Sequence, residues 1–471
     1  VLSLRVALAE QPAFVPEGQP LTPGPANLGH YLSLRRHDLR PLQRRLMPLG
    51  LSSLGRLESR VLPTLDAVLF ALSSITGRVS PYGPPDEKAF FAGEVRLAEA
   101  TDSLFGSPAA HRRGRIMVTL PGEAASDPAF LLDLAKRGMD CARINCAHDD
   151  ADTWRKLAGH ARAAGVATGR DIRVLMDIAG PKIRTENVLA VRKGKLGVGD
   201  LVRLVAAGPA RPDDTVPFSA SVSLPEIVLH LKAGDRVRYD DGRLEGVVES
   251  VGGGEAVMRV THTKAGGAKL KSEKGLNLPD TELDLSPLTG KDDADLAAVI
   301  ECADMIGYSF VSRPEDIDLL DEALERHGPR EKVLGLVAKI EQPRAVHNLP
   351  ALIARATRGG RPFGVMIARG DLAAEIGFER VAEMQEEILW ICEAAGVPAI
   401  WATQVLEDLV KDGLPSRGEM TDAAMAARAE CVMLNKGPAV GEAVSLLDRL
   451  LARMDGHIFK KTPTLRALAS W

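Results

Sequence analysis

Residues 362–381 read PFGVMIARGDLAAEIGFERV, and this stretch carries the pattern that decides the fold. Residues 364–368 form a short apolar run, typical of a buried strand, which leads directly into Arg369, Gly370 and Asp371. In a closed barrel of parallel strands, the carboxyl ends of the strands open onto the active-site face, and polar residues gather there. The stretch therefore predicts a barrel strand followed by functional residues.

Other apolar runs resemble this one, and helical patterns separate most of them. In chain order the eight runs are RIMVTL, CARIN, IRVLMD, ADMIGYSF, KVLGLVAKI, FGVMIA, PAIWAT and ECVML. Eight alternations of strand and helix favour an α/β fold with a closed (β/α)8 TIM barrel over an open parallel sheet. We expect this barrel to comprise residues 113–186 and 277–471.

Residues 187–276 interrupt the repeat with a different pattern. Apolar and polar residues alternate in VRYDDGRLEGVVESVGGGEAVMRVTHT, with turn signals at Asp241-Gly242 and at residues 252–254. Period-two alternation bounded by such turns predicts antiparallel strands. We therefore expect a small β domain inserted in a loop of the barrel.

Residues 1–112 predict an N-terminal helical extension and a linker. Leu39, Leu42 and Leu46 recur at helical spacing, and the stretch SPYGPPDEK then breaks the helical pattern. Four arginines lie opposite these leucines: Arg36, Arg40, Arg44 and Arg45. We interpret the arginines as a solvated helix face, with binding of an acidic ligand as the alternative.

The composition is that of an ordinary globular protein. Of 471 residues, 45% are hydrophobic and 26% are charged, and the formal net charge of -4 gives no reason to expect a nucleic-acid partner. Five scattered cysteines form no CxxC pair, as in proteins of a reducing compartment. No apolar stretch approaches the roughly 20 residues that span a bilayer. We therefore expect a cytoplasmic protein without a membrane partner.

Polar residues stand at the ends of several predicted strands. Lys339 and Glu341 are two positions apart, so on a strand both side chains point the same way. A surface ion pair is the alternative, but the preceding VLGLV is too apolar for an exposed strand. Glu341 and Asp371 offer hard oxygen ligands suited to Mg²⁺ or Mn²⁺. A strand-end Asp can also simply cap the next helix.

Cationic side chains accompany these carboxylates. Arg143, Arg184 and Lys339 beside a divalent metal describe a site for a multiply charged phosphate substrate. His148 is more weakly marked, and a loop histidine with a local hydrogen bond is its alternative. Further polar residues at strand ends are Asn145, Asp177 and Thr403.

A series of motifs resembles one enzyme family in order. The motifs are RINCAHDD, MDIAGPKIRTENV, YDDGRL, SEKGLNLPDTELDL, AKIEQPRAV, VMIARGDLAAEIG, IWATQVLEDL and the pattern around Arg417, Glu419, Thr421 and Asp422. Together they resemble the pyruvate kinase family over residues 113–450. The resemblance implies a glycolytic phosphotransferase that converts phosphoenolpyruvate and ADP to pyruvate and ATP.

The resemblance also implies a role for the charged residues. Glu341 and Asp371 would hold Mg²⁺ or Mn²⁺. Lys339 would stabilise the transferring phosphoryl group and the developing enolate. Arg143 and Arg184 would bind phosphate oxygens through their planar donor groups.

Further roles concern substrate, nucleotide and proton. Thr403 would serve the route, through water, that delivers the proton. His148 and Lys274 would contribute to nucleotide binding, and the inserted domain would be a small β-barrel lid that excludes water. The substrate carboxylate would meet the turn formed by Ala368, Arg369, Gly370 and Asp371.

The monovalent-cation site of that family is altered in this chain. Asn145 and Asp177 match two of its ligands, but Ala147 and Ile178 stand where the family has Ser and Thr. Lys182 occupies a position that is usually Glu, and its ammonium can take the place of the K⁺ charge. We therefore expect that K⁺ is not required; a lysine that merely reaches solvent is the alternative.

Other departures concern catalysis and regulation. Asn435 begins a segment, NKGP, that replaces Ser-Gly-Glu-Thr and removes a hydroxyl of the proton relay. Glu273 replaces a cation that faces the nucleotide, which predicts weaker nucleotide binding or a different acceptor. The match ends before the family's C-terminal effector domain, so we expect no activation by fructose bisphosphate. As for the family, we expect a homo-oligomer.

Three functions remain open from the sequence. A pyruvate kinase is favoured by Arg143, Arg184 and the inserted lid, which a nucleotide acceptor requires. A metal-dependent lyase or aldolase acting through a pyruvate enolate would use the same carboxylates. A non-catalytic regulatory protein with this fold is favoured by the changes at Glu273 and Asn435.

Overall fold

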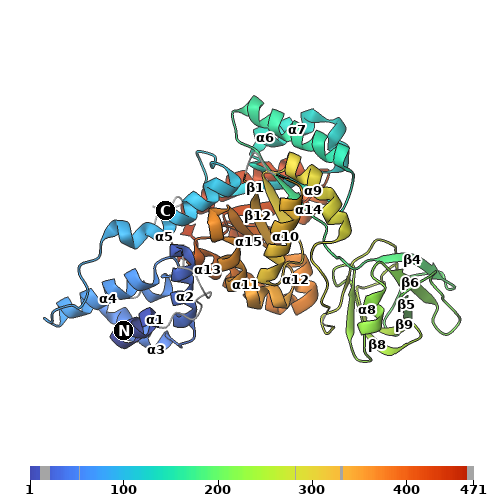
Figure 1. Cartoon of the computed structure of the whole chain (residues 1–471), viewed down its shortest axis with the longest axis horizontal. Helices are drawn as coiled ribbons and strands as arrows, with labels where there is room; N and C mark the ends of the chain where they lie inside the picture. Colours follow the sequence, from blue (N-terminus) through green and yellow to red (C-terminus); the bar gives the residue numbers. More distant parts are fainter. Residues whose placement is uncertain (11–21, 52, 282, 329–332, 464–471) are drawn as a thin grey trace.

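The computed structural model describes residues 1–10, 22–51, 53–281, 283–328 and 333–463. Figure 1 shows a barrel at the centre of the molecule, a group of N-terminal helices on one side and a smaller β domain on the other. Among the described helices, none is long and apolar enough to cross a membrane.

Eight parallel strands close the central barrel. They are β1 (Arg115–Thr119), β2 (Cys141–Asn145), β3 (Arg173–Asp177), β11 (Met305–Tyr308), β12 (Gly335–Ile340), β13 (Phe363–Ala368), β14 (Ala399–Ala402) and β15 (Cys431–Leu434). Neighbours in the chain are neighbours in the sheet, and β15 returns to pair with β1. Each strand falls in one of the eight predicted runs, so the prediction of a (β/α)8 barrel is confirmed.

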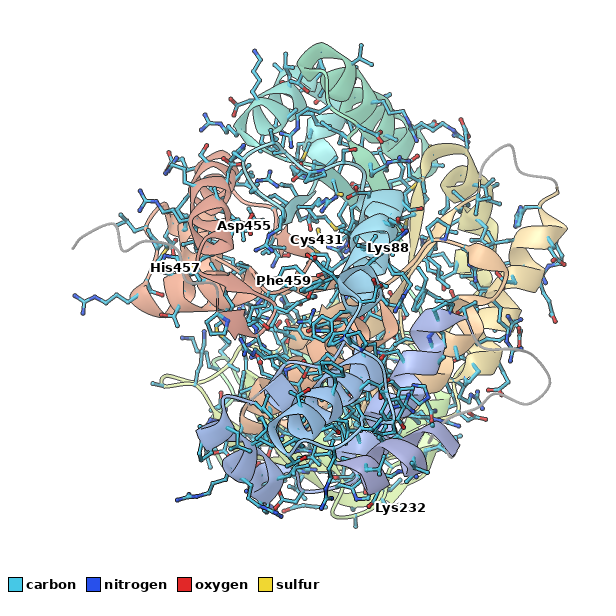
Figure 2. All side chains as sticks on the ribbon, turned by 90° about the vertical axis from the view of Figure 1, so that its left-hand side faces the viewer. Lys88, Lys232, Cys431, Asp455, His457 and Phe459 are labelled. Atoms are coloured by element: carbon cyan, nitrogen blue, oxygen red, sulfur yellow. The ribbon has the colours of Figure 1, made fainter. Side chains whose placement is uncertain are left out.

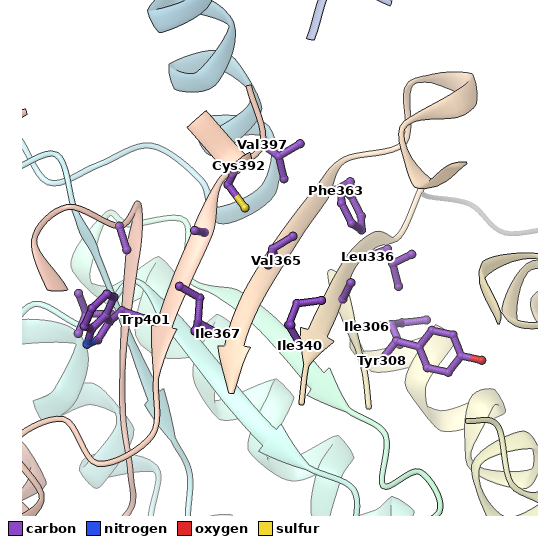
Figure 3. Packing of buried hydrophobic residues seen from close by; sticks show 14 of the residues in the cluster. Ile306, Tyr308, Leu336, Ile340, Phe363, Val365, Ile367, Cys392, Val397 and Trp401 are labelled. Carbon is purple, nitrogen blue, oxygen red and sulfur yellow. The ribbon is translucent and has the colours of Figure 1, made fainter. Parts of the chain in front are cut away.

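Helices surround the barrel and bury one face of each strand. The helices are α6 (Pro128–Arg137), α7 (Ala151–Thr168), α9 (Gly290–Cys302), α10 (Pro314–Arg326), α11 (Pro343–Ala356), α12 (Arg369–Ile376), α13 (Phe378–Ala395), α14 (Glu407–Asp412), α15 (Arg417–Ala426) and α16 (Val440–Asp455), with short 3-10 turns η3 (Gly122–Ser126) and η4 (Arg358–Gly360). Figure 3 shows part of the core between strands and helices, where Leu336, Val365 and Ile367 are almost completely buried. Burial on both faces explains why these strands read as continuous apolar runs.

The inserted β domain forms a seven-stranded sheet in the order β10-β7-β8-β9-β5-β6-β4. Its elements are β4 (Thr185–Ala190), β5 (Leu201–Val205), β6 (Phe218–Val222), α8 (Glu226–His230), β7 (Arg236–Tyr239), β8 (Leu244–Gly252), β9 (Glu255–Thr263) and β10 (Leu276–Asn277). Gly253 and Gly254 make the turn between β8 and β9, and both have positive φ, 61° and 77°. The pairing is not wholly antiparallel as expected, because β5 and β6 run parallel.

The two connections between barrel and β domain pair with each other. Arg184 and Gly275 form an antiparallel bridge. Beside it, Thr185 donates its backbone N–H to the carbonyl of Lys274, and Leu276 donates to the carbonyl of Ile183, each at 2.9 Å. The β domain is therefore tethered to the barrel through a short paired neck.

Among the N-terminal helices, α2 packs against the barrel helix α13. The N-terminal helices are α1 (Leu2–Glu10), α2 (Pro23–Arg35), α3 (Arg40–Leu46), η1 (Met47–Leu49), η2 (Ser53–Gly55), α4 (Val61–Ile75) and α5 (Glu87–Phe105), and Figure 2 views the molecule from their side. Asn27 donates its side-chain amide to the carbonyls of Glu58 and Ala394, at 2.7 and 2.8 Å. A short hairpin of β16 (Ile458–Phe459) and β17 (Thr462–Pro463) lies at the other end of the described chain.

The last turn of α5 fills one end of the barrel. Leu104 and Phe105 belong to the same buried cluster as residues from inside the barrel, such as Met117, Leu175 and Val337. The cluster shows that α5 supplies part of the barrel's inner core.

Two glycines make room for this helix end. A Cβ atom added at Gly335 or Gly364 would lie 2.6 or 2.5 Å from a methyl carbon of Leu104. These glycines stand at the starts of β12 and β13. The fit therefore depends on residues far apart in the sequence.

Candidate active site

A largely buried ammonium lies between two carboxylates at the carboxyl ends of the barrel strands. Lys339 Nζ is 2.8 Å from Glu341 Oε1 and 3.3 Å from Asp177 Oδ1. It also donates to Ser309 Oγ at 2.7 Å. Because Glu341 is only 2% exposed, the surface ion pair considered from the sequence is excluded.

The surroundings shift the pKa of both Lys339 and Glu341. Burial acts to lower the pKa of Lys339, but the charges of Asp177 and Glu341 outweigh it and raise that pKa. Burial, together with the charge of Asp371, raises the pKa of Glu341. The second carboxylate oxygen of Glu341 accepts the backbone N–H of Phe310 at 2.7 Å.

Asp177 also holds the guanidinium of Arg143. Arg143 Nε and Nη2 both donate to Asp177 Oδ2, the first at 2.9 Å, and Nη1 donates to Thr119 Oγ1 at 3.0 Å. Burial acts to raise the pKa of Asp177, but Lys339 and Arg143 hold it below its ordinary value. Arg143 is thus fixed at the barrel mouth by groups of β1 and β3, the two strands that flank its own strand.

Asp371 pairs with a lysine that enters from the loop after β3. Lys182 Nζ donates to Asp371 Oδ1 at 2.8 Å and lies 3.9 Å from Asp241 Oδ1 of the β domain. Burial acts to lower the pKa of Lys182, yet Asp371 and Asp241 raise it. The pKa of Asp371 is lowered, because Lys182 outweighs the effect of burial. The idea that Lys182 simply reaches solvent is therefore wrong.

The start of α12 presents backbone N–H groups without a side-chain cap. Gly370 lies in this first turn, and a Cβ atom added there would be 2.7 Å from Thr403 Cγ2. Thr403 follows β14 and has a positive φ of 72°. Uncapped N–H groups at a helix start can bind an anion, and Gly370 lets Thr403 approach them.

The Arg369 side chain supports this turn. It pairs with Asp422 through two contacts of 2.5 and 2.9 Å. It also donates to the carbonyls of Ala402 and Thr403, and its guanidinium lies 4.7 Å from the centre of the Trp401 ring. The side chain of Arg369 thus connects the ends of β13 and β14, whereas its backbone forms the first residue of α12.

Arg184 and Lys274, two of the residues predicted to contact the nucleotide, lie at the neck of the β domain. Arg184 Nη1 donates to the carbonyl of Glu273 at 3.1 Å. Lys274 Nζ lies 2.9 Å from Asp240 Oδ1. Burial and the positive charges of Lys436 and Arg184 lower the pKa of His148.

The carboxylates fit a divalent metal only with additional ligands. In the described ranges, no group of three or more His, Cys, Asp and Glu side chains could hold a metal ion. Glu341 and Asp371 follow the adjacent strands β12 and β13 and are close enough for one charge to act on the other. Two hard oxygen ligands with remaining positions for water and substrate oxygens suit Mg²⁺.

Comparison with known proteins shows to which family the chain belongs. A family profile described as "Pyruvate kinase, barrel domain" matches residues 111–444. The chain belongs to the pyruvate kinase family. Curated pyruvate kinases from Mycobacterium intracellulare and Agrobacterium vitis are 32% and 34% identical, over 74% and 76% of this chain and 71% and 72% of theirs.

A solved structure gives the same result. A pyruvate kinase from Cryptosporidium parvum superposes with a TM-score of 0.64 at 27% identity, over 76% of this chain and 73% of that one. The resemblance found in the sequence motifs is thereby confirmed, and with it the enzyme class. Members of this pyruvate kinase family use a divalent metal, a nucleotide and phosphoenolpyruvate.

Residues at or next to the positions that depart from the pyruvate kinase motifs form contacts within the chain. Asn145 Oδ1 accepts the backbone N–H of Ala147 at 3.1 Å, and Asn435 Nδ2 donates to Glu407 Oε2 at 2.9 Å. Glu273 has a positive φ of 62° in the turn before β10. The ammonium of Lys182 contacts Asp371 and Asp241, on the side of the predicted metal ligands.

Sequence reasoning missed Ser309 and Phe310. Ser309 Oγ donates to the carbonyl of Ile178 at 2.6 Å while it accepts from Lys339. Phe310 has a positive φ of 57°, which turns its N–H toward Glu341. Ser309 directly follows β11, so the rule used for the other strand ends could have found it. No comparable signal marks the backbone of a phenylalanine.

Proposed function

We propose that this chain transfers the phosphoryl group of phosphoenolpyruvate to ADP and then protonates the pyruvate enolate. The P–O bond to the enol oxygen breaks, a new P–O bond to the ADP β-phosphate forms, and a proton is added at the methylene carbon. Family membership supports this reaction. The observation that carries the proposal is the largely buried ammonium of Lys339 between Asp177 and Glu341.

Lys339 stabilises the negative charge that develops in the reaction. A fixed cation in a site with little water acts more strongly on a spread anionic charge than it does in solution, and it needs no reorganisation. The two carboxylates keep Lys339 protonated, since they raise its pKa. Ser309 and Asp177 also contact the ammonium and help to orient it.

Glu341 and Asp371 would hold Mg²⁺ or Mn²⁺. When bound, the metal supplies positive charge to the phosphoryl oxygens and the enolate. Arg143 and Arg184 bind phosphate oxygens as planar donors, and the N–H groups of Arg369, Gly370 and Asp371 bind the substrate carboxylate. Thr403 stands next to Gly370 and hands the proton on through water, while Lys274 and His148 contact the nucleotide.

A lactate dehydrogenase-coupled assay with phosphoenolpyruvate, ADP and Mg²⁺ tests the function. We expect pyruvate to form, and Lys339→Met to lower kcat by at least ~10²-fold, the usual effect of removing a preorganised charge. Arg326→Met, on the exposed pair with Asp293, is the matched control and should leave kcat unchanged. Pyruvate formation that is absent in the native chain, or equal in Lys339→Met, would contradict the proposal.

We also propose that the reaction does not require K⁺. Lys182 already supplies a positive charge beside Asp371, while Ala147 and Ile178 offer no side-chain oxygen to an ion. In the same assay, K⁺ and tetramethylammonium should give equal rates. The triple variant Lys182→Glu, Ala147→Ser, Ile178→Thr should gain activation by K⁺. Several-fold activation of the native chain by K⁺ would show that Lys182 does not replace the ion.

A further inference from the structure

A pocket outside the candidate active site lies between the helical extension and the barrel. Its volume is about 530 Å³, in the range of small-molecule sites. The lining comes from α2, α3 and the loop between them, from four residues of the segment that precedes α4, from Trp390 of α13, and from Lys461 of the β16–β17 turn. None of the candidate active-site residues discussed above lines it. Figure 2 views the molecule from the side on which these N-terminal helices lie.

Positive charge dominates the lining of this pocket. Four cationic side chains face two carboxylates, which leaves two net positive charges with His37 counted as neutral. The cations are Arg35, Arg36, Arg40 and Lys461, and the carboxylates are Asp38 and Glu58. Such a balance suits a dianion.

Two of these arginines are available to bind it. In the described part of the chain, neither Arg35 nor Arg36 forms an ion pair with a carboxylate. Arg35 donates to the hydroxyl of Tyr31 at 2.6 Å and lies 4.7 Å from the centre of the Trp390 ring. These contacts hold the guanidinium at the pocket but leave its charge uncompensated. A planar guanidinium binds phosphate through two parallel hydrogen bonds.

Glu58 provides an acceptor at the same pocket. Its side chain is buried, with only 2% exposure. One carboxylate oxygen pairs with Lys461 and accepts from the hydroxyl of Tyr31 at 3.4 Å. The other, Oε2, is buried and has no hydrogen-bond partner among the described residues. Because an unpaired buried acceptor is costly, the carboxyl group is suited to accept a hydroxyl of a ligand.

We propose that this pocket binds a small organic phosphate that also carries hydroxyl groups, such as a sugar phosphate. Arg35 and Arg36 bind the phosphate, and a sugar hydroxyl donates to Glu58. The carbon skeleton packs against the apolar part of the wall, which includes Leu34 and Leu57. The inference is independent of the proposed catalytic reaction.

Titration calorimetry of the full chain tests the site with ribose 5-phosphate as the probe. Ribose and inorganic phosphate serve as the two partial probes. We expect ribose 5-phosphate to bind at one site per chain and at least tenfold more tightly than either partial probe. Absence of binding, or equal binding of inorganic phosphate, would overturn the proposal.

Variants then locate the bound probe. Arg35→Gln with Arg36→Gln should weaken binding at least tenfold. The matched control is Arg44→Gln with Arg45→Gln, two exposed arginines of α3 that do not line the pocket. Binding that survives Arg35→Gln with Arg36→Gln, or that is lost in Lys339→Met, would assign the probe to another site and overturn the proposal.

Glu58 is tested separately, because its substitution removes the ion pair with Lys461. Glu58→Gln should weaken ribose 5-phosphate severalfold and leave inorganic phosphate unchanged. A thermal unfolding scan checks that this variant is folded. An equal loss for both probes would overturn the role assigned to the hydroxyl.

Discussion

Asp371 has two competing partners at the scale of single residues. It is a predicted metal ligand, and in the structure it pairs with the ammonium of Lys182 at 2.8 Å. A metal that binds there must share or displace this ammonium. Lys182 therefore links the predicted metal site to Asp241 of the β domain, which is its second carboxylate neighbour.

We expect Asp371→Asn to weaken Mn²⁺ binding at least ~10-fold, since even outer partners of a metal site contribute that much. An amide keeps the size of the side chain but loses its negative charge. Asp241→Asn is the matched control, because it also faces Lys182 but is no predicted ligand, and its Mn²⁺ affinity should change little. Titration followed by electron paramagnetic resonance measures both. Equal affinity in Asp371→Asn and the native chain would remove Asp371 from the metal site.

Some of these residue contacts could be predicted and others could not. The spacing of Lys339 and Glu341 was enough to place both side chains on one side of β12, because alternation along a strand is a local rule. The pair of Lys182 and Asp371 joins two loops far apart in the chain, so no local pattern reveals it. The same holds for the N–H of Phe310, whose direction depends on a backbone torsion.

At the scale of elements, α13 carries a buried acid against the helical extension. Glu393 is 8% exposed. Burial raises its pKa to about 8, although Lys460 lowers it, and Glu58 and Glu430 add negative charge nearby. The carboxyl group therefore keeps its proton in the folded chain at pH values where it has lost it in the unfolded chain.

This difference predicts that stability falls as pH rises. Between the ordinary pKa of a glutamate and about 8, the native state binds one proton more than the unfolded state. The free energy of unfolding then decreases with pH by at most about 1.4 kcal/mol per unit, and the decrease ends above the folded pKa. Glu393→Gln should remove this contribution and gain stability relative to the native chain from pH 5.5 to pH 8.5.

Urea unfolding at several pH values measures the effect. Glu379→Gln, at an exposed position of the same helix, should follow the pH profile of the native chain. Parallel profiles for Glu393→Gln and the native chain would show that this carboxyl group is charged in both states.

An element could be predicted from the sequence where its hydrophobic pattern is complete within one segment. Each barrel strand is buried on both faces, so its apolar run is visible without its neighbours. The parallel pairing of β5 with β6 could not be seen, because alternation tells which face is buried and not which strand lies beside it. Helix α5 was hidden for a related reason, since its most buried residues contact strands that come much later.

At the scale of the whole molecule, the end of helix α5 completes the core of the barrel. Leu104 and Phe105 are 2% and 0% exposed and close one end of the barrel. The barrel core is therefore incomplete without residues that precede its first strand.

We expect Leu104→Ala to lower the free energy of unfolding by about 2–5 kcal/mol, as for other large-to-small changes in a core. Leu104 packs against Gly335 and Gly364, and these glycines have no side chains that could fill the cavity left by its truncation. Val95→Ala is the matched control in the same helix, because Val95 is 53% exposed, and it should stay within about 0.5 kcal/mol. Urea denaturation monitored by circular dichroism measures both. Similar midpoints for the two variants would mean that the end of α5 is not needed to close the barrel.

The position of α5 also bears on how the chain reaches its native state during translation. The apolar tip emerges from the ribosome before any strand of the barrel, whereas the glycines that receive it belong to the fifth and sixth of the eight barrel strands. Until then, the tip and the open strands are both exposed, and such partly assembled species are the ones that associate wrongly. Nascent chains halted before β13 should consequently be the ones that chaperones retain longest.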